Sequence, residues 1–197
     1  MTGGPDASLP GGVDLIVEDD GWTAAIPAPD ALAAACYDAA SRFEPALGGA
    51  GLSLLLTSDA ALRDLNVRFR GKDAPTNVLA FPAHVSPDWP PDWPTERRAA
   101  EPAPRFLGDV ALARETCLRE ARGRGVAVAD HAAHLIVHGV LHLIGYDHQD
   151  EDEAVRMENR ETAILAALGV ADPYDAADHD ETGPCPDEPY GDEVETL

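Results

Sequence analysis

One segment, His138 to His148, restricts the fold of this chain more than any other part of its sequence. It reads HGVLHLIGYDH. Because an α-helix turns by about 100° per residue, His138 and His142 lie one turn apart on the same helical face. His148 would lie about 240° away around the axis if the helix continued. Gly145 permits the left-handed conformation that ends a helix and turns the chain back. The segment therefore predicts a helix that stops at Gly145 and three imidazoles that converge.

Three converging imidazoles are a typical ligand set for a divalent metal ion. A catalytic zinc site has three protein ligands and keeps a fourth position for water. We therefore predict that His138, His142 and His148 bind one Zn²⁺ ion, with His138 also a candidate catalytic residue. Imidazole also suits Ni, Cu or Fe, so another divalent transition metal stays open. The alternative is a set of helix-face histidines that hydrogen bonds satisfy.

Two further histidines extend the same helical face upstream. His134 lies one turn before His138, and His131 lies before that. One turn of helix rises about 5.4 Å, so His134 would need a different metal position. We expect both residues to pack or to support the site, and not to bind the same ion.

The spacing of the three predicted ligands equals that of the metzincin peptidases, HExxHxxGxxH, with one change. Gly139 stands where those enzymes have the glutamate that serves as general base. A metallopeptidase whose base has moved to Asp147 or Glu151 is therefore a second hypothesis, and Gly139 argues against it. A metal ion can also activate water and polarise a phosphoryl oxygen. Asp147 could orient such a water or serve only the structure of the helix end.

A phosphodiester substrate needs a cation near the metal, and the best candidates follow a predicted helix. Arg70 and Lys72 flank Gly71, which permits close approach of the backbone. The planar guanidinium group of arginine matches phosphate oxygens. Arg70 and Lys72 are therefore candidate substrate-binding residues, and Arg70 is a candidate catalytic residue. The alternative is a solvated turn with a surface ion pair.

The order of the predicted elements indicates an α+β fold. Strands and helices alternate but are too few for a doubly wound sheet. We expect a small mixed four-stranded sheet and about five helices, of which the histidine helix is zincin-like. The predicted strands are 13–18, 52–56, 78–81 and 107–113, and the predicted helices are 30–43, 114–122, 128–144, 151–168 and one from Ser58 or Asp59 to Gly71.

Charge is strongly acidic and unevenly spread along the chain. Lys and Arg number 14 and Asp and Glu 36, which gives a net charge of −22. Residues 171–197 hold ten of the acids and no Lys or Arg, so we predict an acidic disordered tail and a charge of −12 for the remainder. Residues 1–12 are a predicted flexible N-terminus, and residues 83–105 a Pro/Trp-rich surface loop. A broad electropositive face for nucleic acid is excluded, so any polyanion must bind at a local basic site or at a metal.

The sequence also bears on the compartment. It has no run of 18 apolar residues, and Arg42 is its first basic residue, so we expect neither a membrane span nor a signal peptide. The three cysteines are far apart and form no CxxC pair. This argues against a disulfide framework or a cysteine zinc site and predicts the reducing cytoplasm.

Taken together, these motifs resemble the YbeY endoribonucleases, also called rRNA maturation factors. The resemblance covers roughly residues 13–174 and rests on four blocks in order: RGKDxPTNVLxFP from Arg70, LGDV from Leu107, HGxLHLxGYDH from His138 and ALGxxDPY ending at Tyr174. It implies that residues 13–170 form a metal-dependent endoribonuclease domain with the zinc site at the end of the histidine helix.

The same resemblance implies the ligands, the substrate and the partners. His138, His142 and His148 would bind the zinc ion, and Arg70 would match the family's catalytic-site arginine. The implied activity is single-strand-specific cleavage of RNA in maturation of the 3′ end of small-subunit rRNA and in ribosome quality control. The implied partners are single-stranded RNA or rRNA, and the ribosomal small subunit or assembly factors. The nucleophile, water or a ribose 2′-hydroxyl, stays open, and a non-catalytic ribosome-assembly module is a third hypothesis.

Overall fold

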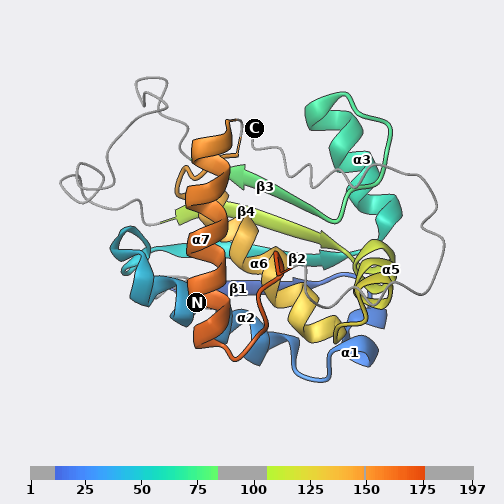
Figure 1. The fold of residues 1–197 in the computed structure, drawn as a ribbon. Helices are drawn as coiled ribbons and strands as arrows, with labels where there is room; N and C mark the ends of the chain where they lie inside the picture. The colour runs from blue at the N-terminus through green and yellow to red at the C-terminus, as the bar shows by residue number, and fades with distance from the viewer. Residues whose placement is uncertain (1–11, 84–105, 149, 176–197) are drawn as a thin grey trace, which may run out of the picture.

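The computed structural model describes residues 12–83, 106–148 and 150–175 of the chain (Figure 1). Its centre is a four-stranded sheet in the order β1-β2-β4-β3. The strands are β1 (Gly12–Val17), β2 (Gly51–Thr57), β3 (Val78–Pro82) and β4 (Phe106–Ala113). The first three in that spatial order are parallel, and β3 is antiparallel to β4. The predicted α+β class with a mixed four-stranded sheet is therefore confirmed.

Six α-helices surround this sheet in the described residues. They are α1 (Gly21–Ala25), α2 (Pro29–Phe43), α3 (Asp59–Arg70), α5 (Arg114–Arg124), α6 (Val128–Leu143) and α7 (Glu151–Ala167), and a 3₁₀ turn spans Pro45–Leu47. The five predicted helices are present within a few residues. The sequence did not predict α1, because five residues are too few to show a helical period.

The helix ends follow from local chemistry. Ser58 accepts a hydrogen bond from the Ala61 N–H at the start of α3, as its predicted capping role requires. Gly71 ends the same helix with a φ of 69°, a left-handed conformation that favours glycine. At α7, Asp150 accepts from the Glu153 N–H over 2.8 Å. These caps place Arg70 and Glu151 at helix ends.

The sheet separates two layers of apolar packing. The larger core lies between the sheet and helices α2, α6 and α7, and it includes Leu54, Val110, Val137 and Ile164. The smaller cluster lies under α3 on the opposite face and includes Leu79. Strands buried on both faces read as continuous apolar runs, which explains the sequence GLSLLLT of β2. Helix α6 is thereby held firmly between the sheet and α7.

Several expectations fall wholly or partly outside the described residues. The predicted flexible N-terminus, the Pro/Trp-rich loop and the acidic tail are described only at residues 12, 83 and 171–175, so they stay predictions. Cys36 and Cys117 are buried and form no disulfide. Of the described helices, none is by itself long and apolar enough to cross a membrane, and α5 with α6 meets that criterion only as a pair bent by 116°.

Candidate metal centre

The histidine helix ends where the sequence predicted. Helix α6 is followed by Gly145 with a φ of 87°. The Gly145 N–H donates to the His142 carbonyl over 2.9 Å, and the Tyr146 N–H donates to the Leu141 carbonyl over 3.1 Å. Both bonds run back into the last turn and satisfy carbonyls that the helix leaves open. The chain therefore reverses and brings His148 back beside α6.

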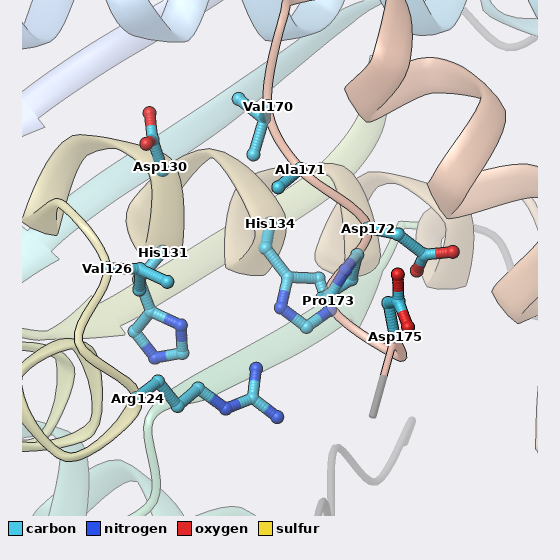
Figure 2. A pocket seen from close by; sticks show the side chains of 10 residues that line it. All are labelled: Arg124, Val126, Asp130, His131, His134, Val170, Ala171, Asp172, Pro173 and Asp175. Carbon is cyan, nitrogen blue, oxygen red and sulfur yellow. The ribbon is translucent and has the colours of Figure 1, made fainter. Parts of the chain in front are cut away.

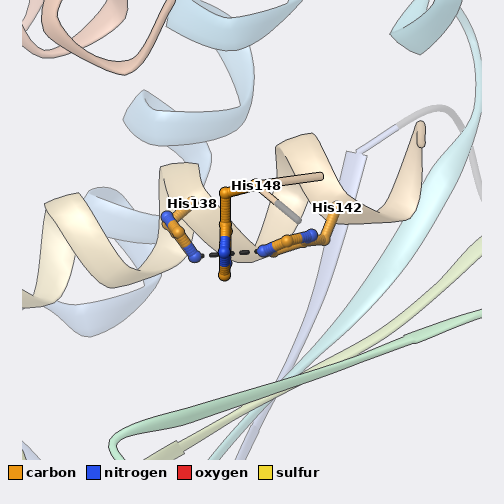
Figure 3. A group of neighbouring side chains, drawn as sticks. All are labelled: His138, His142 and His148. Carbon is orange, nitrogen blue, oxygen red and sulfur yellow. Dashed lines mark hydrogen bonds between the residues drawn. The ribbon is translucent and has the colours of Figure 1, made fainter. Parts of the chain in front are cut away.

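The three histidine rings meet at this reversal (Figure 3). The Nε2 atoms of His138 and His142 lie 3.0 Å apart. The His148 ring centroid lies 5.6 Å from that of His138 and 5.1 Å from that of His142. One possible ligand atom from each residue falls within 4.8 Å of the others. The convergence of the rings is an observation, whereas their role as metal ligands stays a prediction.

Hydrogen bonds to the Nδ1 atoms of two of the rings determine which ring nitrogen carries the hydrogen. His142 Nδ1 lies 2.9 Å from the Tyr146 carbonyl, and His138 Nδ1 lies 2.5 Å from Glu161 Oε1. A carbonyl or a carboxylate can only accept, so both Nδ1 atoms carry the hydrogen. The two Nε2 atoms therefore face each other at 3.0 Å, on the side of the rings away from these partners. A cation placed near both nitrogens could be bound by both rings at once.

The inward nitrogen of His142 is suited to bind a metal ion because this ring does not take up a proton readily. Burial, followed by the neighbouring His138 and His148, lowers the pKa of His142 to about 3, so this ring is neutral near pH 7. His148 Nε2 is buried as well and has no hydrogen-bond partner among the described residues. A metal ion could be bound by one ring nitrogen from each of the three histidines. The residues present therefore fit a divalent ion bound by imidazole.

Glu161 is the central support of this cluster. Its carboxylate is fully buried on α7 and accepts from His138 Nδ1 at 2.5 Å, from His134 Nε2 at 3.1 Å and from the Tyr174 hydroxyl. Burial by itself would raise the pKa of Glu161, but the hydrogen bonds from His134 and His138 outweigh it and hold the pKa well below its usual range. Glu161 is therefore a buried anion that fixes the hydrogen on His138.

A second set of contacts holds the turn that carries His148. The Tyr146 hydroxyl donates to Glu44 Oε1 over 2.7 Å, and Arg160 Nε donates to the same atom over 2.9 Å. Glu44 is buried, so these two bonds satisfy its charge. Asp147 accepts from the backbone N–H of His148 over 2.8 Å, which is a structural contact within the turn.

Arg70 and Lys72 lie together, but in a separate pocket. This pocket has a volume of about 220 Å³ and is also lined by Asn66, Arg119 and Glu120. None of the three converging histidines is among the described residues that line it. Glu120 joins the pocket to α6, because its carboxylate bonds His131 Nε2 over 2.8 Å. The structure thus brings the histidines together, and the two cations together, without merging the two groups.

A smaller pocket of about 140 Å³ lies along the N-terminal half of α6 (Figure 2). Its lining includes Arg124, His131 and His134. Neither His131 nor His134 is in the group formed by the three converging histidines, which agrees with the expectation from the helix rise. The ligand atoms of His134, His138 and Glu161 also lie within 4.8 Å of one another. Hydrogen bonds already connect these three groups.

Comparison with known proteins identifies the family. The family model described as Endoribonuclease YbeY matches residues 22–169.

The chain belongs to the YbeY family.

Relatives that carry the name Endoribonuclease YbeY agree with this assignment. The Rhodopseudomonas palustris protein (strain CGA009) is 46% identical over 84% of this chain and 82% of its own length. The Azorhizobium caulinodans protein is 48% identical over 82% of this chain and 95% of its own length. A solution structure of a Thermotoga maritima protein covers 83% of this chain and 99% of its own, with 19% identity and a TM-score of 0.48.

The fold explains why this YbeY chain has a glycine directly after His138. A Cβ atom at Gly139 would lie 2.6 Å from Val110 Cγ1 on β4. The side chain of residue 139 would therefore point into the sheet and away from the histidine cluster. A glutamate there could not act as the general base of a peptidase without displacing α6 from β4. The structure thus adds a steric reason to the sequence argument against peptide hydrolysis.

Sequence reasoning missed the support of the YbeY histidines by Glu161 and Tyr174. Met157, Glu161, Ile164 and Leu165 are the buried residues of α7. Their spacing forms one apolar stripe with a single acid inside it. A carboxylate within such a stripe is rarely left unpaired, because burying an isolated charge is very costly. This interruption was the available signal, although it did not name the partner.

Proposed function

We propose that this chain is a zinc-dependent endoribonuclease that cleaves single-stranded RNA, with the ion held by His138, His142 and His148. The observation that carries the proposal is the convergence of the three rings, in which one possible ligand atom from each lies within 4.8 Å of the others and the Nε2 atoms of His138 and His142 are 3.0 Å apart. Family membership supports cleavage of RNA as the reaction. The substrate is rRNA of the small ribosomal subunit during maturation of its 3′ end and during ribosome quality control, in the cytoplasm where ribosomes assemble.

The protein residues have separate tasks in this reaction. When bound, a zinc ion lowers the pKa of water and polarises a phosphoryl oxygen. Glu161 keeps the hydrogen of His138 on Nδ1, and the Tyr146 carbonyl does the same for His142, so both Nε2 atoms stay available as ligands. We assign binding of the substrate, and stabilisation of the negative charge on its phosphate, to Arg70 and Lys72.

Arg70 and Lys72 bind phosphate groups of the RNA in their own pocket. Its volume of about 220 Å³ and its two cations suit a phosphate, and Arg119 adds a third positive charge. Because the chain as a whole is acidic, RNA must bind at a local basic site, and this pocket is such a site. Arg70 acts as a catalytic residue if its phosphate is the one that is cleaved.

Cleavage of a labelled single-stranded RNA by zinc-loaded protein tests the proposal. We expect His142→Ala to lose both the zinc and the activity. His131→Ala is the matched control for metal content, because His131 lies on the same helix and bonds Glu120 instead of the cluster. Full RNA cleavage by zinc-free His142→Ala would refute the metal assignment, and faster cleavage of casein than of RNA would favour a peptidase.

The product ends then identify the nucleophile. Attack by the ribose 2′-hydroxyl leaves a 2′,3′-cyclic phosphate on the upstream fragment, whereas attack by water leaves a 3′-hydroxyl on the upstream fragment and a 5′-phosphate on the downstream fragment. Mass spectrometry of the two fragments distinguishes these outcomes.

A further inference from the structure

An aromatic ring is exposed at the end of α3, close to the basic pocket. Phe69 is 47% exposed and is the one aromatic residue among the large exposed hydrophobics of the described structure. Its ring meets the ring of Phe81 on β3 edge-on, with centroids 5.3 Å apart and planes at 66°. The Arg68 guanidinium carbon lies 5.3 Å from the centroid of Phe69. We call Arg68, Phe69 and Phe81 the Phe69 platform.

The chain segment that carries Arg68 and Phe69 is basic, whereas Phe81 has an exposed acid, Asp109, as its cross-strand neighbour on β4. Residues 68–72, RFRGK, hold three cations and no acid in a chain with a net charge of −22. Asp73, the next acid, pairs with Arg63 over 2.6 Å. Arg70 and Lys72 line the pocket described above. Phe69 is therefore an exposed aromatic ring within a basic segment of the chain.

Aromatic and cationic groups side by side suit one class of ligand in particular. Single-stranded nucleic acids bind through bases that stack on aromatic rings or on arginine, while a positively charged groove follows the backbone. A duplex offers no such base, because its bases are stacked on one another. The chemistry of the platform therefore matches unpaired RNA.

The position of β3 connects the platform with the histidine helix. β3 is the edge strand of the described sheet, next to α3 (Figure 1). Phe81 packs with the cluster under α3, whereas Ala80 belongs to the core on the side of α6. One strand thus separates the two faces at this edge. β3 therefore lies between the platform on one face of the sheet and α6 on the other.

We propose that the Phe69 platform stacks an unpaired base of the RNA substrate, while Arg70 and Lys72 bind the adjoining phosphates. This inference rests on the proposed function and deepens it, because it assigns the residues that select single-stranded RNA. A base of the RNA can stack on the exposed Phe69 ring only where that base is unpaired.

Binding of a 2′-O-methyl RNA strand of about 12 nucleotides to the full zinc-loaded chain, measured by fluorescence anisotropy, tests the platform. The 2′-O-methyl groups block attack by the ribose hydroxyl, and a gel verifies that the strand stays intact. We expect Phe69→Ala to weaken binding by about 5- to 100-fold, which corresponds to the loss of one stacked base. Phe69→Leu keeps an apolar contact with Phe81 but has no flat ring, so it should weaken binding similarly, whereas Phe69→Trp should retain it.

Val67→Ala is the matched control. Val67 is on the same helix and 44% exposed, so its truncation should change the dissociation constant by no more than about twofold. Thermal unfolding verifies that each variant is folded. Equal affinities of Phe69→Ala and Val67→Ala would overturn the proposal, as would an equal loss of affinity for single-stranded and duplex RNA.

The test separates this inference from the proposed function. Cleavage of RNA by the wild-type chain with no dependence of binding on Phe69 removes the platform and leaves the nuclease. If binding depends on Phe69 but the zinc-loaded chain cleaves no RNA, the nuclease proposal is wrong and the platform remains.

Discussion

Replacing Glu161 by glutamine tests how the fold prepares His138 for a metal ion. The carboxylate accepts three donors, from His138, His134 and Tyr174. Glutamine keeps one acceptor oxygen and replaces the other by an NH₂ group, which can only donate. A neutral amide oxygen accepts a weaker hydrogen bond than a carboxylate, so His138 is oriented less firmly in either amide orientation. With the NH₂ group toward His138, the ring must also move its hydrogen to Nε2, and the inward lone pair is lost.

The expected magnitude follows from these contacts. Loss of a residue that orients a metal-binding histidine typically lowers metal affinity about 10- to 100-fold. A buried donor that is left without its partner costs about 1–3 kcal/mol of stability. We therefore expect Glu161→Gln to lower zinc affinity by about one to two orders of magnitude, and to lower the free energy of unfolding of the zinc-free protein by about 1–3 kcal/mol.

Two measurements separate the orientation of His138 from general stability. Competition with a chromogenic chelator gives the zinc dissociation constant, and urea unfolding of the metal-free protein gives the stability. Tyr174→Phe is the control, since it removes one donor from Glu161 and leaves the bond to His138. Its zinc affinity should stay near that of the wild type. A Glu161→Gln protein that is destabilised but binds zinc as tightly as the wild type would refute the reasoning.

Three further outcomes are expected. The metal-free protein should lose stability as the pH falls from 6.5 toward 3, because His142 binds a proton in the unfolded chain but not in the folded one. This residue contributes at most about 1.4 kcal/mol per pH unit. In urea titrations, His142→Asn should reduce the dependence of stability on pH. Gly139→Ala should lower the free energy of unfolding by about 1–3 kcal/mol, with partial recovery in the double variant Gly139→Ala/Val110→Ala, as measured by thermal unfolding. Arg70→Ala should weaken RNA binding and lower its salt dependence by about one phosphate contact, and an unchanged salt slope would contradict a phosphate contact.

Local sequence periodicity predicted much of this architecture. The four strands and five of the helices were recognisable because apolar spacing, Ser58 and Gly71 act within a few residues of one another. The short α1 lacked such a period. Its one fully buried side chain, Trp22, is held by a hydrogen bond to the Thr57 carbonyl 2.9 Å away, a contact between distant parts of the chain.

The convergence of three histidines is a property of the sequence itself. A spacing of four residues and a glycine stop determine it, since both act through the geometry of one helical turn. The tertiary structure alone decided that Glu161 supports His138, that Gly139 faces Val110, and that Arg70 occupies a separate pocket. These relations depend on how α7, β4 and α3 pack around α6. Packing joins residues that are far apart in the chain, and no local pattern records which of them meet.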